Sequence, residues 1–362
     1  MKNNKLNIAF MFGGRSTEHE VSLTSAVGIF PQFNREKFNV TPVKVTLDGE
    51  WRVLDSSDME TADKVAAGQG RRVLLGDPSV KGLIDPVSGE TIQVDVVFPI
   101  LHGTYGEDGS LQGMLAMANI PCVGCGILSS ALGFDKILMK QVFIQNDLQT
   151  PDFIWFLRKK WKEEPEAILR GIKEVVGYPC FVKPANTGSS VGVGKALDEA
   201  SVVRAIDEAC RFDRKILVEK GVNAREIECA VLGNDAPEAS VLGEVIPANE
   251  FYDYDAKYND ARSKTLIPAD LPEAVAERIR FQAVHAFKSL DCAGLARVDF
   301  LLEKETHEIY INEINSLPGF TPISMYPKLW EASGVSYPEL LERLVDLAME
   351  RFGDLNQTSY KL

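Results

Sequence analysis

The sequence predicts an α/β protein in which strands and helices alternate. Three short runs of apolar residues, at 7–12, 40–46 and 94–101, have the length and composition of buried strands. Helical patterns and polar loops lie between them, and this βαβ alternation is typical of a parallel sheet covered by helices. With 362 residues, 45% of them apolar, the chain is long enough for two or three domains with proper cores.

Charge and composition exclude several classes of protein. The formal net charge is −13, and no Lys/Arg block is long enough to follow a nucleic acid, so we expect no nucleic-acid partner. No apolar run approaches the ~18 residues of a membrane span, and we expect no membrane partner. Of the six cysteines only Cys122 and Cys125 form a C-x-x-C pair, and no second pair completes a zinc site. We therefore expect reduced cysteines and a cytoplasmic location.

Two polar residues follow the first and third predicted strands. The first strand runs into a polar stretch in which a helix should begin near Ser16 or Thr17. Ligands of open α/β sheets gather at the carboxyl ends of strands, so Glu18 lies where a ligand would bind. An acid in the first turn also stabilises a helix without any further role, and Glu18 alone does not decide between these readings. His102 similarly either contacts a ligand or only holds the glycine-rich loop at 101–115.

A second glycine-rich loop occurs at 180–195, in CFVKPANTGSSVGVGK. Its apolar run ends at Lys183, which can offer a positive charge to phosphate. The glycines that follow let the backbone approach a ligand, and successive N–H groups in such a turn can bind an anion. The spacing fits neither a Walker A motif nor G-x-G-x-x-G. Spacing alone therefore does not separate a phosphate-binding loop from a plain glycine-rich hairpin.

Three oxygen-bearing side chains lie on or just after two apolar runs near the C-terminus. The runs LARVDFLL and EIYINEI read as strands, and they place Asp299, Glu313 and Asn315 close together if the strands are neighbours. Such ligands suit Mg²⁺, which binds through one or two carboxylates plus substrate phosphates. Ordinary strand-end acids facing water are the alternative. The glycine-rich loop at 180–195 favours the metal site.

Further patterns predict, in chain order, a second α/β unit from near 125–140, whose helix in GILSSALGFDKILMKQVF begins at Ser129 or Ser130, and a strand at 215–220. They also predict strands in EIECAVLG and VLGEVI, and helices at about 272–290 and 336–352. The last helix should open with a capping box at Ser336 and end before Gly353. The segment 249–268 fits neither period. It is long, aromatic and charged, which is typical of an active-site lid.

Eight segments, in order, carry a resemblance to a known family: GGRSTEHEVS, HGTYGEDGSLQG, LGFDK, VKPANTGSSVGVGK, VEKGVNAREIE, FYDYDAKY, ARVDF and NEINSLPGFTPISMYP. The series closely resembles the D-alanine–D-alanine ligases of the ATP-grasp superfamily, over nearly the whole chain. The resemblance implies an α/β fold that is α+β in its ATP-grasp part. It implies an N-terminal Rossmann-like parallel sheet domain at 1–124, a central ATP-grasp subdomain at 125–220 and a C-terminal one at 221–362, with the lid at 249–268.

The resemblance also implies a nucleotide and metal site. ATP would be bound by Lys136 and Lys183 at the α- and β-phosphates, Ser190 in the loop over the phosphates, Glu219, Lys220 and Val222 at the adenine, Glu226 at the ribose and Lys257 at the γ-phosphate. Two Mg²⁺ or Mn²⁺ ions would be held by Asp299, Glu313 and Asn315.

Substrate residues follow from the resemblance in the same way. Glu18 would pair with the ammonium of the first D-alanine, beside His102. Arg297 and the backbone N–H of Gly319 would stabilise the oxyanion, and Ser324 and the backbone of Met325 would receive the carboxylate of the second D-alanine. Glu18, Ser189 and Tyr258 would form a hydrogen-bond chain that clamps the closed lid.

The activity implied is ATP-dependent joining of two D-alanines through a D-alanyl phosphate, with release of ADP and phosphate. It would serve peptidoglycan synthesis, and hence cell wall biogenesis and cell shape, in a cytoplasmic homodimer. Family members that make D-alanyl-D-lactate carry Phe in place of Tyr258 or a different lid, so this sequence favours an amine acceptor. The alternatives are a D-lactate or other ATP-grasp carboxylate–amine ligase, a non-catalytic nucleotide-binding protein, and a small-molecule kinase.

Overall fold

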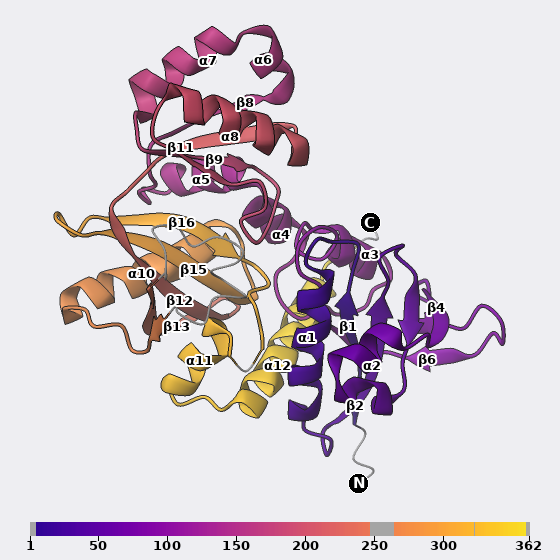
Figure 1. Cartoon of the computed structure of the whole chain (residues 1–362). Helices are drawn as coiled ribbons and strands as arrows, with labels where there is room; N and C mark the ends of the chain where they lie inside the picture. Colours follow the sequence, from indigo (N-terminus) through magenta and orange to yellow (C-terminus); the bar gives the residue numbers. More distant parts are fainter. Residues whose placement is uncertain (1–4, 247–263, 322, 360–362) are drawn as a thin grey trace.

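The computed structural model of the chain describes residues 5–246, 264–321 and 323–359 (Figure 1). Within these residues the strands form three sheets, of seven, four and five strands. Figure 1 shows these sheets as separate groups, each with its own helices. Within the described residues no helix combines the length and the apolar character that crossing a membrane requires.

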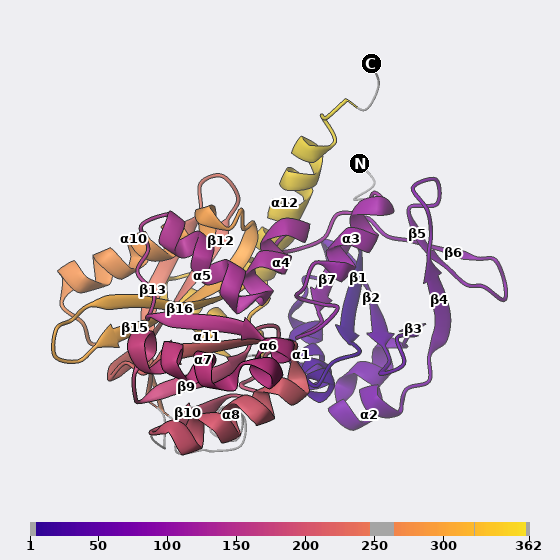
Figure 2. The same ribbon diagram turned by 90° about the horizontal axis from the view of Figure 1, so that it is seen from above.

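The three strands predicted in the N-terminal part form the parallel part of the first sheet, at one of its ends. They are β1 (Leu6–Gly13), β2 (Phe38–Val45) and β7 (Val96–Ile100), with β1 between the other two. Four short antiparallel strands extend the sheet beyond β2, so the sheet as a whole is mixed. These are β3 (Trp51–Val53), β4 (Arg71–Leu75), β5 (Gly82–Ile84) and β6 (Thr91–Gln93). Figure 2 shows β4, β5 and β6 at the edge farthest from the other two sheets.

Helix α1 (His19–Ile29) begins later than the sequence suggested. The hydroxyl of Ser16 accepts a hydrogen bond from the N–H of Glu18 at 3.0 Å, inside the turn that precedes the helix. Ser16 therefore orders the turn and does not cap the helix, and Glu18 occupies the cap position without a side-chain capping bond to the helix. The other helices of this part are α2 (Ala62–Ala67) and α3 (Ser110–Met117).

The second sheet is antiparallel, in the order β10-β9-β11-β8. Its strands are β8 (Phe153–Leu157), β9 (Cys180–Pro184), β10 (Gly194–Ala196) and β11 (Lys215–Lys220). Helices α6 (Arg158–Glu163), α7 (Pro165–Gly171) and α8 (Glu199–Phe212) cover one face through a core that includes Trp161, Ile206 and Val218. On the other face Leu217 packs against Ile137 of α5 (Lys136–Gln145). Figure 1 shows α5 between this sheet and β16.

The third sheet is antiparallel, in the order β14-β13-β12-β15-β16. Its strands are β12 (Ala224–Gly233), β13 (Glu238–Ile246), β14 (Lys264–Leu266), β15 (Gly294–Glu303) and β16 (Ile309–Asn315). Helix α10 (Glu273–Ser289) packs on it, and so do α4 (Ile127–Phe134) and α5. Strand β14 forms the described end of the predicted lid. Residues 249–263 of that segment, with Lys257 and Tyr258, lie outside the described residues.

The C-terminal helices connect the third sheet to the first. Helices α11 (Met325–Ala332) and α12 (Tyr337–Leu355) share one hydrophobic core with β1 and β7. The rings of Phe98 and Phe320, 6.4 Å apart, lie in this core. The expected end of α12 before Gly353 is wrong, because Gly353 lies inside the last turn with open space around it. Ser336 precedes α12 as expected but makes no side-chain capping bond.

Candidate active site

The start of α5 brings a lysine between the second and third sheets. Asp135 caps the helix by accepting two first-turn N–H groups at 3.1 Å each. The N–H of Lys136 donates to the carbonyl of Ala185 at 3.1 Å, which ties the helix to the end of β9. The ammonium of Lys136 donates to the carbonyl of Thr187 at 2.8 Å and lies 3.8 Å from a carboxylate oxygen of Glu313. It therefore stands at a helix N-terminus, where anions are favoured.

The glycine-rich loop between β9 and β10 is built from left-handed residues. Ser189 (φ +48°), Ser190 (φ +57°) and Gly192 (φ +72°) all have positive φ. Positive φ is uncommon in residues other than glycine, so the two serines mark a specially shaped turn. Asn186 anchors the start of the loop by donating its N–H and its amide to Asp213, at 2.8 and 2.9 Å. Such turns gather neighbouring N–H groups into a concavity that binds anions.

The tip of this loop contacts the N-terminal part of the chain through Glu18. The carboxylate of Glu18 accepts a hydrogen bond from the hydroxyl of Ser189, and Glu18 is only 7% exposed. Glycines make this approach possible, because a Cβ on Gly188 would lie 2.4 Å, and one on Gly103 2.8 Å, from Glu18 Oε2. The described part of the Glu18–Ser189–Tyr258 chain is thus in contact, while Tyr258 lies outside the described residues.

His102 lies beside this contact in a buried acidic setting. Its Nδ1 is 3.6 Å from a carboxylate oxygen of Glu107, and its Nε2 is buried without a hydrogen-bond partner among the described residues. Burial lowers the pKa of His102, but the carboxylates of Glu107 and Glu18 outweigh it, and the net shift is upward. Burial also raises the pKa of Glu107. The ring nitrogen of His102 that is left for a ligand is Nε2.

Glu219 of β11 is buried between two lysines. Lys183 of β9 contacts one of its carboxylate oxygens, and Lys140 of α5 lies 3.0 Å from the other. Lys183 also reaches the third sheet, 3.5 Å from the side-chain oxygen of Asn312. Burial raises the pKa of Glu219, but the two lysines more than offset this and hold it at about 2. Sequence reasoning missed Lys140, whose only signal is a charge directly after the apolar run Ile137–Met139, four residues after Lys136.

The other residues expected to bind adenosine lie where the chain passes from β11 to β12. The side chain of Lys220 is exposed, and its N–H donates to the carbonyl of Asp152 at 2.9 Å. Val222 and Glu226 are half-buried. Because Lys220 points outward, only its backbone can take part in a contact on the inner side.

A row of three carboxylates crosses the third sheet. Glu228, Asp299 and Glu313 are directly opposite one another on β12, β15 and β16. Like charges in such positions repel. Arg297 offsets this repulsion by donating to both oxygens of Asp299, at 2.7 and 2.6 Å, and by lying 2.9 Å from Glu228. Burial lowers the pKa of Arg297, but these carboxylates raise it well above its ordinary value.

Asp299, Glu313 and Asn315 converge as the sequence predicted. The amide of Asn315 donates to Asp299 at 2.9 Å. No set of three or more His, Cys, Asp or Glu side chains among the described residues is arranged to hold a metal. Two carboxylates and an amide nevertheless fit Mg²⁺ when phosphates complete its ligands. Arg297 and Asn315 already donate to Asp299, so a cation bound there would share the carboxylate oxygens with these two donors.

The last group of predicted site residues lies at a helix N-terminus. Ser324 precedes α11 and Met325 is its first residue. The hydroxyl of Ser324 accepts the N–H of Thr321 at 3.0 Å, and a Cβ on Gly319 would lie 3.1 Å from the same hydroxyl. Gly319, Ser324 and Met325 therefore share one turn, at a helix end that favours a carboxylate.

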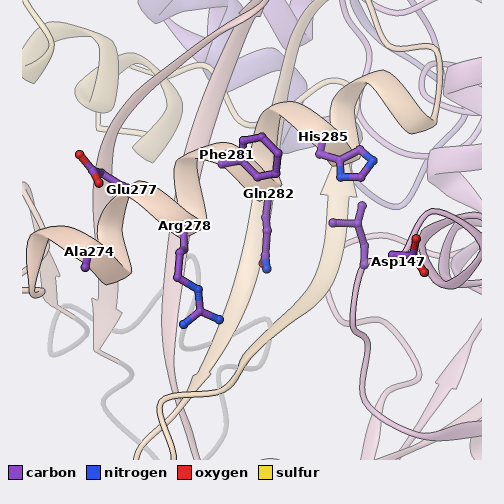
Figure 3. Close-up of a pocket in the computed structure, with 8 residues that line it drawn as sticks. Asp147, Ala274, Glu277, Arg278, Phe281, Gln282 and His285 are labelled. Atoms are coloured by element: carbon purple, nitrogen blue, oxygen red, sulfur yellow. The ribbon is translucent and has the colours of Figure 1, made fainter.

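A groove of about 520 Å³ lies elsewhere, between α10 and the turn after α5 (Figure 3). It is lined by residues that include Asp147, Arg278, Phe281 and His285, and it contains none of the residues predicted for the site. The functional residues described above do not depend on it.

The fold and the site together define an ATP-grasp ligase. Lys136 of α5 and Lys183 of β9 lie between a glycine-rich loop on one antiparallel sheet and the acid-bearing strand of the next, and the buried carboxylate of Glu18 contacts the loop. Comparisons with known proteins place the chain more narrowly. The sequence model of the D-ala D-ala ligase N-terminus matches residues 7–125, and that of the C-terminus matches residues 142–346.

Individual relatives match over nearly the full length. The D-alanine–D-alanine ligase of Heliobacterium modesticaldum is 52% identical, covering 96% of each chain. The D-alanine–D-alanine ligase structure from Coxiella burnetii is 35% identical with a TM-score of 0.85, covering 98% of this chain and 96% of that one. The VanG D-Ala:D-Ser ligase from Enterococcus faecalis is 36% identical with a TM-score of 0.86, covering 95% and 100%. The chain belongs to the D-alanine–D-alanine ligase family.

Proposed function

We propose that this protein joins two D-alanine molecules into D-alanyl-D-alanine, with conversion of ATP to ADP and phosphate. One observation carries the proposal most directly. Ser189, at the tip of the phosphate-type loop, contacts Glu18, a buried carboxylate beside His102. A site for phosphate and a site for an amino acid are therefore adjacent, which is what phosphorylation of an amino-acid carboxylate requires.

The first step activates the carboxylate of the first D-alanine. Glu18 pairs with its ammonium, and a carboxylate oxygen attacks the γ-phosphorus of ATP as the bond to ADP breaks. Lys136 and Lys183 offset the charge on the phosphates, Ser190 in the loop lies over them, and positioning supplies much of the remaining rate. Asp299, Glu313 and Asn315 would hold Mg²⁺ or Mn²⁺, which neutralises phosphate charge when bound. Lys257, assigned from the sequence, reaches the γ-phosphate.

The second step captures the acyl phosphate with an amine. The amine of the second D-alanine attacks the acyl carbon, and the tetrahedral oxyanion is stabilised by Arg297 and the N–H of Gly319. Arg297 uses Nε and Nη2 for its carboxylates, and Nη1 makes no hydrogen bond to the described residues. Ser324 and the N–H of Met325 hold the carboxylate of the acceptor. Phosphate then leaves with the oxygen of the broken C–O bond.

Binding of the nucleotide base completes the site. Glu219 accepts a hydrogen bond from the 6-amino group of adenine, and the backbone of Lys220 and Val222 lines the adenine edge. Glu226 accepts hydrogen bonds from the ribose hydroxyls. Water must be excluded because acyl phosphates hydrolyse readily, and the segment 249–268 acts as the lid. The proposal includes cytoplasmic location, a homodimer, and peptidoglycan precursor synthesis as the use of the product.

Product stoichiometry tests this proposal. Purified protein with ATP, Mg²⁺ and D-alanine should release ADP, phosphate and dipeptide in equal amounts, and L-alanine should give none. ADP without phosphate would indicate a kinase instead, and absence of ADP would indicate a non-catalytic nucleotide-binding protein. A panel of D-alanine, D-serine and D-lactate as acceptors then measures whether an amine or a hydroxyl is the preferred nucleophile. Because the sequence carries Tyr258, we expect the amine to be preferred.

A further inference from the structure

Lys140 is a buried charge that the reaction described above does not use. It is 1% exposed and is among the largest fully buried side chains of the described residues. Its ammonium lies 3.0 Å from Oε2 of Glu219, the single carboxylate within ion-pair distance among the described residues. Lysine is almost never fully buried unless it is paired.

Burying such a pair adds little to stability, because well-packed apolar residues of similar volume often do as well. A second buried lysine of this protein shows what a purely structural role looks like. The ammonium of Lys44 donates to three backbone carbonyls, those of Val65, Ala66 and Gly68. Lys140, in contrast, faces a carboxylate at the proposed nucleotide site.

Glu219 has two lysine partners with different duties. Lys183 contacts Oε1 of Glu219, lies beside the glycine-rich loop, and is the lysine that the proposed function sends to the phosphates. When Lys183 binds phosphate, Oε1 becomes available to the base, and Lys140 alone remains as the counter-ion of Glu219. Lys136 and Lys140 are four residues apart on α5 and lie on the same face of the helix. The same helix therefore supplies one cation to the phosphates and a second cation to the base pocket.

We propose that Lys140 is a positioning residue: it holds Glu219 as an ionised acceptor while Lys183 binds phosphate, and thereby makes the site prefer a 6-amino purine to a 6-oxo purine. The inference rests on the proposed function, in which Glu219 meets the adenine edge. An ionised carboxylate only accepts hydrogen bonds, so it pairs with the 6-amino group of adenine and repels the 6-oxo group of hypoxanthine. A protonated carboxyl can donate to the 6-oxo group, and the preference is then lost.

Nucleotide selectivity separates this role from a structural one. The ratio of kcat/KM for ATP to that for ITP is measured with saturating D-alanine, and the Kd of each nucleotide is measured without D-alanine. Lys140→Met should lower the ATP:ITP ratio of kcat/KM and the corresponding ratio of affinities about tenfold or more. The reason is that the 6-amino group of adenine then no longer donates to a charged carboxylate. Lys140→Arg, which keeps the charge, should retain the selectivity. Lys44→Met is the matched control: it removes a buried lysine and should lower the Tm without changing either ratio.

A double-mutant cycle with Glu219→Gln completes the test. Once the carboxylate is gone, Lys140→Met should change the selectivity no further. An unchanged ATP:ITP ratio in Lys140→Met, or an equal loss of selectivity with Glu219→Gln already in place, would overturn the proposal. If Lys140→Met does not fold, Lys140→Gln replaces it and is judged by the same ratios. Failure of the unaltered protein to make dipeptide would instead refute the proposed function. The Kd values of ATP and ITP in the unaltered protein and in Lys140→Met would still test the role of Lys140.

Discussion

The contact between Glu18 and Ser189 provides a sharp test of how the amino-acid site and the phosphate loop work together. Ser189→Ala removes the hydroxyl that donates to Glu18, and Glu18→Gln keeps the shape of the side chain but removes its charge. We expect both substitutions to lower kcat/KM for D-alanine. Glu18→Gln should do so more strongly, because it also removes the partner of the substrate ammonium.

The magnitude follows from burial. A hydrogen bond to a charged group contributes about 1.5–3 kcal/mol, which corresponds to roughly tenfold to 150-fold in kcat/KM. Glu18 is 7% exposed, so water cannot readily replace the lost hydroxyl. Ser79 provides a matched control, since its hydroxyl also donates to a carboxylate, that of Asp77, but at an exposed site. Ser79→Ala should leave kcat/KM within about twofold, as solvent screens such contacts.

The assay is dipeptide formation at saturating ATP with D-alanine varied, for the two single variants, the double variant and Ser79→Ala. Coupling between Glu18 and Ser189 should make the double variant less impaired than the product of the two single effects. Strict multiplicativity of the two effects, or a loss in Ser189→Ala no larger than that of the control, would refute the claim that the two residues act as a unit.

Three further predictions address the metal site, the lid and the base pocket. Glu313→Gln should slow ADP formation at least about a hundredfold while leaving the Tm nearly unchanged, and near-normal turnover with Mg²⁺ would contradict the metal assignment. Tyr258→Phe should shift product toward the ester when D-alanine and D-lactate compete, and unchanged partitioning measured by chromatography would count against its role. Burial raises the pKa of Glu219, but Lys140 and Lys183 bring it to about 2, below its ordinary 4.5. Its stabilising effect is therefore present above pH 4.5 and is lost as the pH falls toward 2, so the Tm gap between the unaltered protein and Glu219→Gln should narrow from pH 5 to pH 3.

Local patterns in the sequence were sufficient for the two strands that carry the predicted metal ligands. Two short apolar runs predicted β15 and β16, and the antiparallel pairing of these strands sets Asp299 opposite Glu313. The strands β3 to β6 were not predicted, because runs of three to five residues give too little periodicity to recognise. Helix starts were also imprecise, since Ser16 can bond within a turn as readily as it can cap a helix.

Contacts between distant segments could not be predicted from local patterns. Glu228 joins the row of acids only through the register of β12 against β15, which is decided across about seventy residues of chain. The pairing of Lys140 with Glu219 likewise depends on how α5 packs against β11. Resemblance to the family supplied the set of site residues that local patterns left open. Neither the resemblance nor the patterns indicated a role for Glu228 or Lys140.

The formation of a D-alanyl phosphate can be tested most directly with D-alanine carrying ¹⁸O in both carboxylate oxygens. The attacking carboxylate oxygen becomes the bridge to phosphorus and leaves with phosphate when the amine captures the acyl group. Mass spectrometry of the phosphate released during dipeptide synthesis should therefore find one ¹⁸O atom in each molecule. Unlabelled phosphate, released together with the dipeptide, would contradict activation of the carboxylate by phosphoryl transfer.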